Sequence, residues 1–397
     1  MSQTLQDAYI VKTVRTPVAK YNGKFKHVRP DDLLAHVLKG VVADTLELKA
    51  RVEDVIIGCA MPEAEQGMNV ARIATLLAGY PDHVPAITIN RFCSSGSQAV
   101  ALAADRIRVG EADVMIAGGT ESMTMIPMMG NKIALNPKVL NDENIAIAYG
   151  MGITAEKVAE QWKISREDQD LFAVESHRRA LAATEAGYFK DEILDYEVEL
   201  SFQSPGKLET TQQRYVVSQD EGPRPGSTPE ALTKLRTVFQ ADGTVTAANS
   251  SQMSDGAGAV LLVSEKILKE FNLEPSGRFI TSAVVGVPAD IMGIGPKEAI
   301  PMCLQRAGLK QDQMDWIELN EAFAAQALAI CNELDLDRDK VNPNGGAIAL
   351  GHPLGATGAI RTATMMHGLK RTGGKYGMVT MCIGTGMGFA MICESFQ

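Results

Sequence analysis

The chain of 397 residues is 45% hydrophobic and 22% charged, a composition that excludes wholesale disorder and a length that suits two or three domains. The formal net charge of −10 argues against a general nucleic-acid binder or a protein of anionic membrane surfaces, although a local basic patch could still take an anionic ligand. Six cysteines are scattered without paired spacing, which indicates a reduced chain without structural zinc.

Strand and helix patterns alternate along the first 120 residues, as in an α/β protein whose mostly parallel sheet is covered by helices. In chain order we expect strands at 8–14, 52–57, 86–89 and 112–117, and helices at 31–48, 69–78 and 98–109. Residues 121–244 differ, because two helices at 155–162 and 167–186 are followed by irregular polar sequence rich in proline and glycine. Such a long insertion commonly forms a lid or a binding loop.

A strand at 260–263 returns to the first half, and a second alternating series follows it. Here we expect strands at 279–287, 314–319, 377–381 and 388–392, and helices at 296–307, 321–334 and 356–369. Asp54 and Asp315 lie in similar strand segments; 39 positions separate Asp54 from Cys93, and 37 separate Asp315 from His352. The spacing predicts two related halves, with domains at 1–120 plus 245–272, at 121–244 and at 273–397.

If the halves pack about a pseudo-twofold axis, Cys93 and His352 meet at the shared interface, where ligands of α/β sheets tend to bind. The alternative is that the two series resemble each other only because they share a fold class.

Cys93 lies where the strand expected at 86–89 breaks into small polar residues before a helix. A thiol at such a junction faces the first free N–H groups and the positive end of the helix dipole, a setting that lowers a thiol pKa and makes the group nucleophilic. The alternative is a packed cysteine, because Cys is among the residue types most often buried.

Three further segments carry candidate chemistry. Asn320 follows an apolar strand, where it can orient a water or a carbonyl group, or simply cap the next helix. His352 is a candidate base in the glycine-rich segment Asn344–Gly358, although a lone histidine is more often packed or solvent-facing. Cys382 ends a strand before a turn whose backbone N–H groups could form an oxyanion hole.

Together with the segment Asn90–Gly96, these features resemble the thiolase family, and the resemblance extends over essentially the whole chain. It implies an α/β fold in which duplicated βα halves form a layered αβαβα core with an inserted loop domain. Further segments fall in the family order, namely Arg15–Pro17, Gly118–Met123, Met151–Glu156, Lys234–Arg236 and Asn249–Gly256.

The resemblance also implies an acyl-transfer mechanism. Cys93 looks like the nucleophile that attacks a 3-ketoacyl-CoA after His352 takes its proton, and Cys382 looks like the acid that protonates the acetyl-CoA enolate. In the family, backbone N–H groups at the positions of Cys93 and Gly384 meet the tetrahedral oxyanion. The enolate-side oxygen is met by the histidine and by a water held on the residue matched by Asn320. Coenzyme A is then a substrate, and neither a metal nor a redox cofactor is expected.

Contacts with CoA are carried over by matched position, and the family assembles as dimers or dimers of dimers. The resemblance therefore implies a homodimer or a homotetramer, with Arg224 as a cation near the anionic cosubstrate. The residues matched to the pantetheine and adenine ends of CoA are Arg224, Ala247, Ser251, Met151 and Phe323.

One departure bears on specificity. Many short-chain biosynthetic thiolases have a histidine before the methionine matched by Met151, where this chain has Gly150. The segments Ile317–Asn320 and Gly351–Thr357 look more like those of degradative members, so we favour thiolysis in fatty-acid β-oxidation over acetoacetyl-CoA synthesis. A decarboxylating 3-ketoacyl synthase works with two histidines, and Cys382 counts against it. A Cys-His-Asn hydrolase and an inactive scaffold subunit are the alternatives from other classes.

The ends of the chain indicate its location. The amino terminus has no basic segment followed by an apolar run, and no apolar stretch reaches the roughly 20 residues that a membrane-spanning helix needs. The final residues, Glu394–Gln397, are not a Ser-Lys-Leu signal. We therefore expect a cytoplasmic protein without a membrane or nucleic-acid partner.

Overall fold

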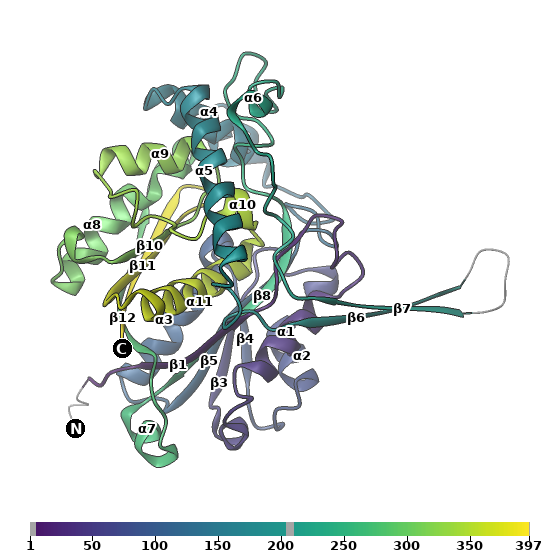
Figure 1. Cartoon of the computed structure of the whole chain (residues 1–397), viewed down its shortest axis with the longest axis vertical. Coiled ribbons are helices and arrows are strands. Elements are labelled where there is room, and N and C mark those ends of the chain that lie inside the picture. The colour runs from purple at the N-terminus through teal and green to yellow at the C-terminus, as the bar shows by residue number, and fades with distance from the viewer. Residues whose placement is uncertain (1–4, 204–209, 397) are drawn as a thin grey trace.

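The computed structural model describes residues 5–203 and 210–396, and Figure 1 shows their arrangement. A ten-stranded sheet runs through the chain in the order β10-β11-β12-β9-β1-β8-β5-β3-β4, with β2 paired to β8. The first half contributes β1 (Tyr9–Arg15), β2 (Ala19–Lys20), β3 (Asp54–Gly58), β4 (Ala86–Ile89), β5 (Val114–Ser122) and β8 (Ser254–Val263). The second half contributes β9 (Gly277–Gly286), β10 (Trp316–Leu319), β11 (Tyr376–Ile383) and β12 (Met387–Ser395).

Helices pack on the sheet and fill the insertion between β5 and β8 (Figure 1). The first half has α1 (Pro30–Gly40), α2 (Val70–Leu77), α3 (Ser95–Arg108) and α7 (Glu265–Phe271). The second half has α8 (Gly295–Ala307), α9 (Ala324–Glu333), α10 (Ala347–Leu350) and α11 (Leu354–Thr372). The insertion holds α4 (Met151–Gln161), α5 (Arg166–Glu185), α6 (Pro229–Leu232) and the hairpin of β6 (Tyr196–Gln203) with β7 (Thr210–Val217), which projects from the body of the molecule.

The strands of the two halves follow the same order when they are counted from the centre of the sheet towards its two edges. β1 and β9 pair antiparallel at the centre. From there the order is β8, β5, β3 and β4 on one side and β12, β11 and β10 on the other. A parallel bridge between Ile317 and Val341 takes the place of β4 in the second half. The prediction of two related halves is confirmed.

Alternate strand residues face opposite layers, as the two-residue period of a strand dictates. Val55 and Ile57 of β3 belong to an apolar cluster with α1 and α2, whereas Ile56 belongs to a cluster with α3. In the second half, Met378 of β11 faces α8 and α9, and Met381 faces α11. Because α3 and α11 share one cluster with the inner faces of both halves, helices and strands form the expected αβαβα layers.

The inner helices α3 and α11 cross near their N-terminal ends. A Cβ atom at Gly358 would lie 2.1 Å from the backbone nitrogen of Ser97, so this close approach requires glycine. Cys93 lies just before α3, and His352 lies just before α11. The crossing therefore brings the two loops that carry the candidate nucleophile and base into one region.

Most of the predicted elements exist with shifted ends, but two predictions are wrong. The helix expected at 31–48 ends at Gly40, and a separate 3₁₀ turn, Leu46–Arg51, follows because Thr45 leaves the helical region and Leu48 packs into the core. The sequence expected to be irregular after residue 186 contains the hairpin β6–β7, which Val198 and Val217 anchor in the core.

The division into three domains at 1–120 plus 245–272, 121–244 and 273–397 stays a prediction. Among the described residues, no helix combines the length and apolar character needed to cross a membrane.

Candidate active site

Cys93 lies in a 3₁₀ turn, Phe92–Ser94, between β4 and α3. Phe92 has a φ of 45°, and this left-handed conformation turns the chain sharply before the thiol. The residue is partly exposed, but its sulfur is enclosed and faces the backbone N–H groups of Gly384 and of Cys93 itself. Burial raises the pKa of the Cys93 thiol to about 11, and these N–H groups only partly offset it. The expected lowering of this pKa is therefore wrong for the resting site.

His352 is buried and is held by two side chains. Its Nδ1 lies 2.6 Å from Thr357 Oγ1, and its Nε2 lies 3.3 Å from Asn320 Nδ2. An amide nitrogen donates and does not accept, so Nε2 is the acceptor and Nδ1 carries the proton that Thr357 accepts. Burial, followed by the positive charge of Arg361, lowers the pKa of His352 to about 3. The imidazole is therefore neutral, with the lone pair of Nε2 available as a base.

Asn320 directly follows β10 but does not cap the next helix. That helix, α9, begins at Ala324, and Gln326 donates from its amide to the Asn320 carbonyl oxygen at 3.1 Å. The side chain of Asn320 instead points at His352, and its buried Oδ1 has no hydrogen-bond partner in the part of the chain that the structure describes. The capping alternative is therefore excluded. An unpaired amide oxygen beside the imidazole is a position where a water molecule or a substrate N–H group can bind.

Cys382 lies near the end of β11, opposite Gly388 of β12, and is fully buried. Burial raises the pKa of its thiol far above the ordinary range, and the neighbouring Cys93 raises it further. Gly384, two residues beyond Cys382, faces the Cys93 sulfur with its N–H group. The end of β11 thus brings a second thiol and a hydrogen-bond donor to the thiol at the start of α3.

The loop of His352 lies on another side of Cys93. Cys93 packs against a small apolar cluster that contains Leu354, two residues beyond His352. Within the described residues no hydrogen bond joins the Cys93 sulfur to the His352 ring. The candidate nucleophile and the candidate base therefore lie in neighbouring loops without a preformed contact, an arrangement often found before substrate binds.

Glu121 holds the backbone of two loops near these residues in place. This buried carboxylate accepts hydrogen bonds from the backbone N–H groups of Ala60 at 2.7 Å, Met61 at 3.2 Å and Gly355 at 2.8 Å, and from the Gln66 amide at 2.7 Å. Burial raises the pKa of Glu121, while these donors stabilise the ionised form and oppose that shift. One carboxylate thus ties the loop after β3 to the first turn of α11.

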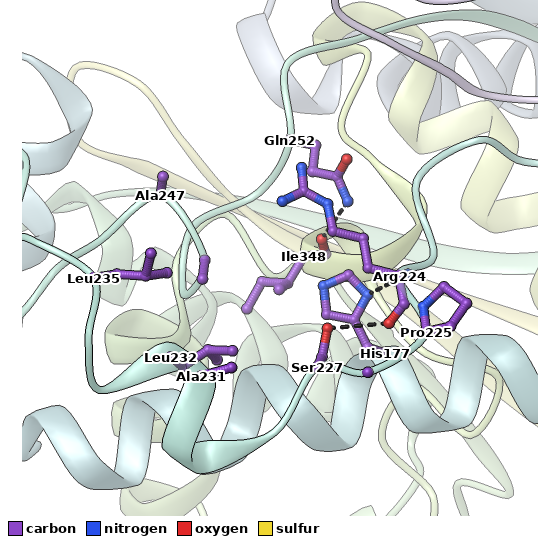
Figure 2. Close-up of a pocket in the computed structure, with 12 residues that line it drawn as sticks. His177, Arg224, Pro225, Ser227, Ala231, Leu232, Leu235, Ala247, Gln252 and Ile348 are labelled. Carbon is purple, nitrogen blue, oxygen red and sulfur yellow. Dashed lines mark hydrogen bonds between the residues drawn. The ribbon is translucent and has the colours of Figure 1, made fainter.

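A cavity of about 250 Å³ lies between the insertion and the loops of both halves, and Figure 2 shows the residues that line it. Two of the predicted CoA contacts, Arg224 and Ala247, line this cavity. Leu235 and Ile348 add apolar surface, and Ser227 adds a hydroxyl group. An apolar cavity with a cation and a few polar groups suits a long, partly anionic ligand.

The other predicted CoA contacts lie nearer to the thiols. Met151 and Phe323 belong to the apolar cluster around Cys382. Ser251 connects the two places, because its N–H donates to the Ala322 carbonyl oxygen at 2.9 Å while the next residue lines the cavity. The five predicted contacts therefore follow a path from the cavity to the second thiol.

Sequence reasoning assigned no individual role to Thr357, Gln252 or His177. Thr357 and Gln252 lie inside segments that were recognised as family-like, so their positions were visible but their hydrogen bonds were not. His177 lies within an ordinary helix, α5, and becomes notable only because the fold places it against the cavity.

A duplicated α/β fold that brings two thiols and a neutral imidazole to one region, with a cavity lined by residues close to the loop of the imidazole, is typical of an enzyme of cysteine-based group transfer. The chain matches the thiolase N-terminal domain over residues 8–266 and the thiolase C-terminal domain over residues 273–395. It belongs to the thiolase family.

Individual relatives agree over nearly the full length. The chain is 49% identical to the 3-ketoacyl-CoA thiolase of Bacillus subtilis (strain 168), with 98% of this chain and 100% of the relative covered. It is 40% identical to human mitochondrial 3-ketoacyl-CoA thiolase, with a TM-score of 0.88 over 98% of this chain and 99% of that one. It is 39% identical to Bacillus anthracis acetyl-CoA acetyltransferase, with a TM-score of 0.88 over 100% of both chains.

Proposed function

We propose that this thiolase uses CoA to cleave 3-ketoacyl-CoA into acetyl-CoA and a shortened acyl-CoA, in fatty-acid β-oxidation. The observation that carries the proposal is that the N–H group of Gly384 faces the Cys93 sulfur beside the Cys382 thiol. The name of the Bacillus subtilis relative supports the same activity. The second candidate, acetyl-CoA C-acetyltransferase making acetoacetyl-CoA, is favoured by the Bacillus anthracis structure but disfavoured by Gly150, which leaves no imidazole before Met151.

The first half-reaction transfers the acyl group to Cys93. The thiol gives its proton to Nε2 of His352 as the sulfur attacks the 3-keto carbon, so that no free thiolate is needed at a pKa of about 11. The N–H groups of Cys93 and Gly384 receive the oxyanion. The bond between carbons 2 and 3 of the substrate then breaks, and its electron pair forms the enolate of acetyl-CoA.

Cys382 completes this half-reaction by giving its proton to carbon 2 of the enolate. The His352 ring and a water on the unpaired Oδ1 of Asn320 stabilise the negative charge on the thioester oxygen. A buried thiol with a raised pKa is a suitable donor to a carbanion, because proton transfer is favoured when the pKa values of donor and acceptor approach each other. Cys382 is left as a thiolate.

The second half-reaction restores both thiols. Incoming CoA gives its thiol proton to Cys382, and its sulfur attacks the acyl group on Cys93. The Cys93 sulfur leaves and takes back the proton from His352, so atoms and charge balance over the cycle. Arg224 and Ala247 hold CoA along the cavity, and Ser251, Met151 and Phe323 guide its pantetheine arm to the thiols. The residues present require no metal for these steps.

The chain also forms a homodimer in this proposal. β4 is an edge strand of the sheet in the described chain, and the large apolar side chains of Met68, Leu77 and Ile87 are 94%, 50% and 48% exposed. An open sheet edge beside exposed apolar side chains is a typical place for pairing with another chain. Ile87→Lys is expected to shift sedimentation from dimer to monomer. Unchanged sedimentation would contradict the use of this edge, and a tetramer would add a second interface.

A cytoplasmic location stays part of the proposal.

The experiment that tests the activity measures acyl-CoA products with and without CoA. We expect cleavage of acetoacetyl-CoA and of longer 3-ketoacyl-CoA substrates only when CoA is present, with higher kcat/KM for the longer chains. Release of free acid would indicate a hydrolase, and malonyl-dependent condensation without cleavage would indicate a decarboxylating synthase. A preference for acetoacetyl-CoA over every longer substrate would favour the second candidate.

A further inference from the structure

The segment Gly222–Ser227 borders the cavity that carries Arg224, and Figure 2 shows its residues Arg224, Pro225 and Ser227 in the lining. Side chains from two other parts of the chain, His177 and Gln252, form hydrogen bonds to its backbone. Its close approach to α10 is visible at Gly222, where a Cβ atom would lie 2.3 Å from the Ala349 carbonyl oxygen. The hydroxyl of Ser227 donates to the Arg224 carbonyl oxygen at 3.1 Å and tightens the turn itself. This hydrogen bond stabilises the conformation of the segment, but it does not fix the position of the segment relative to the catalytic loops.

Gln252 joins this segment to the short helix that precedes His352. Its side-chain amide nitrogen lies 3.0 Å from the carbonyl oxygen of Gly222, 2.9 Å from that of Ile348 and 3.1 Å from that of Ala349. Three carbonyl oxygens around one end of an amide identify that end as the donor NH₂ group. The side chain thus bridges the segment around Arg224 and helix α10.

The main chain of Gln252 reaches His352 directly. Its carbonyl oxygen accepts the backbone N–H of His352 at 3.1 Å and the hydroxyl of Ser254 at 2.8 Å. The same His352 N–H lies 3.2 Å from Ser254 Oγ. One residue therefore contacts the cavity segment through its side chain and the backbone of the catalytic base through its carbonyl group.

His177 contacts the cavity segment but, unlike Gln252, has no hydrogen bond to the loop of His352 within the described residues. Its Nδ1 accepts the backbone N–H of Arg224 at 3.2 Å, and the ring is buried on α5. Burial, followed by the charge of Arg224, lowers the pKa of His177 to about 4, which keeps the ring neutral and able to accept near neutral pH. Its hydrogen bond therefore fixes the backbone from which Arg224 projects.

We propose that Gln252 and His177 are positioning residues that act on different parts of the site. His177 positions only the CoA-binding segment, whereas Gln252 couples that segment to the loop of His352. The inference rests on the proposed function, because it assigns CoA to the cavity of Arg224 and base catalysis to His352. It goes beyond that function by predicting that CoA binding and base geometry share one hydrogen-bonded residue.

The two substitutions should separate KM from kcat. Gln252→Met keeps about the same side-chain length but leaves three carbonyl oxygens without the amide donor. We therefore expect KM for CoA to rise about tenfold and kcat to fall about tenfold. His177→Leu removes only the acceptor for Arg224 N–H, so KM for CoA rises about tenfold and kcat changes less than about twofold. His177→Asn, whose Oδ1 can replace Nδ1 as an acceptor, should restore KM.

Steady-state thiolysis is measured at varied CoA, and the Kd of CoA is measured by calorimetry on the same full-length proteins. Gln213→Met on the exposed face of the hairpin is the matched control and should leave both constants unchanged. Gln252→Ala provides a second variant in case Gln252→Met does not fold, as judged by its thermal midpoint and circular dichroism.

The predicted pattern is a combined change of KM and kcat for the Gln252 variants and a change of KM alone for His177→Leu. The coupling is overturned if folded Gln252 variants change only one constant or neither. The role of His177 is overturned if the Leu and Asn variants behave alike, or if kcat falls as strongly as KM rises. A wild-type protein without CoA-dependent cleavage would instead overturn the proposed function, so the two failures are distinguishable.

Discussion

The two halves of this molecule carry the same strand arrangement, yet their equivalent positions carry different chemistry. The parallel registers of β3 with β5 and of β10 with β11 place Glu121 and Cys382 at equivalent strand ends, opposite Gly256 and Gly388. Glu121 is saturated with hydrogen-bond donors and fixes loops. Among the described residues Cys382 has no comparable set of donors, and it lies beside the other thiol. The shared scaffold thus carries a hydrogen-bonded carboxyl group in one half and the candidate acid/base thiol in the other.

The loops before α3 and α11 differ in the same way. Cys93 lies in a tight turn where its enclosed sulfur faces backbone N–H groups, whereas His352 is oriented by the side chains of Thr357 and Asn320. In our account the first half provides the nucleophile and the second half handles protons. The two halves therefore share one backbone geometry, and we expect the residues at a few strand ends and loops to determine the division of labour between them.

The largest effect is expected from removing the nucleophile of the first half. Cys93→Ala should lower thiolase kcat by at least about 10⁴-fold, because no acyl-enzyme can form. Cys331→Ala, at a buried cysteine in the outer layer of the second half, is the matched control and should retain activity. Comparable losses in both variants would remove the distinction between reactive and packed cysteines.

The next effect separates the two thiols. Cys382→Ser should slow exchange of the acetyl-CoA α-protons by about 10²- to 10⁴-fold, the range typical of general acid–base catalysis. Acylation of Cys93 should fall far less, because the nucleophile and the Gly384 N–H remain. Exchange is followed by the incorporation of deuterium from solvent into acetyl-CoA. An equal loss of exchange and acylation would show that the second half does not specialise in proton transfer.

Glu121→Gln tests the structural side of the comparison. The amide would present a donor to N–H groups that now donate to a carboxylate, so we expect a loss of about 1–3 kcal/mol in the free energy of unfolding. The thermal midpoint reports this loss, and the exposed Glu47→Gln is the control. A variant with unchanged stability but lost activity would instead make Glu121 a direct participant in the reaction.

The smallest effect is a pH dependence of stability from two buried histidines. The pKa of His352 is lowered to about 3 and that of His177 to about 4, from an ordinary value of 6.5. Below pH 6.5 the unfolded chain therefore binds protons that the folded chain does not, so stability falls as the pH falls from 6.5 towards 4. The slope is at most about 1.4 kcal/mol per pH unit for each group.

Thermal midpoints across this pH range check the prediction. His177→Asn should make the decline shallower, whereas replacing the exposed His83 with Asn should not. Identical slopes in wild type and His177→Asn would contradict a neutral His177 in the folded state.

The sequence predicted the fold well where apolar periodicity was strong. Asp54, Asp315 and their following strands revealed the duplication because both halves bury their strands on two faces. The hairpin β6–β7 was missed, although Tyr196, Val198 and Leu200 alternate with polar residues, because its polar neighbours and the adjacent proline and glycine suggested irregular structure. The helix from 31 was extended too far because a buried Leu48 after a turn mimics helical spacing.

The candidate site was predictable by residue but not by geometry. Cys93, His352, Cys382 and Asn320 stand out in short unusual segments, and the fold brings their loops to one region. The raised pKa of Cys93 was not predictable, because the helix end is visible in the sequence while the burial of the sulfur is not. The hydrogen bonds of Gln252 connect segments that are distant in the chain, so no local sequence pattern predicts them.

Mass spectrometry of the protein after incubation with acetyl-CoA, without a second acceptor, tests the division between the halves most directly. We expect one acetyl group on Cys93 in the wild type and in Cys382→Ser, and none in Cys93→Ala. An acetyl group found only on Cys382 or on another residue, or no covalent adduct in a protein that still cleaves 3-ketoacyl-CoA, would contradict it.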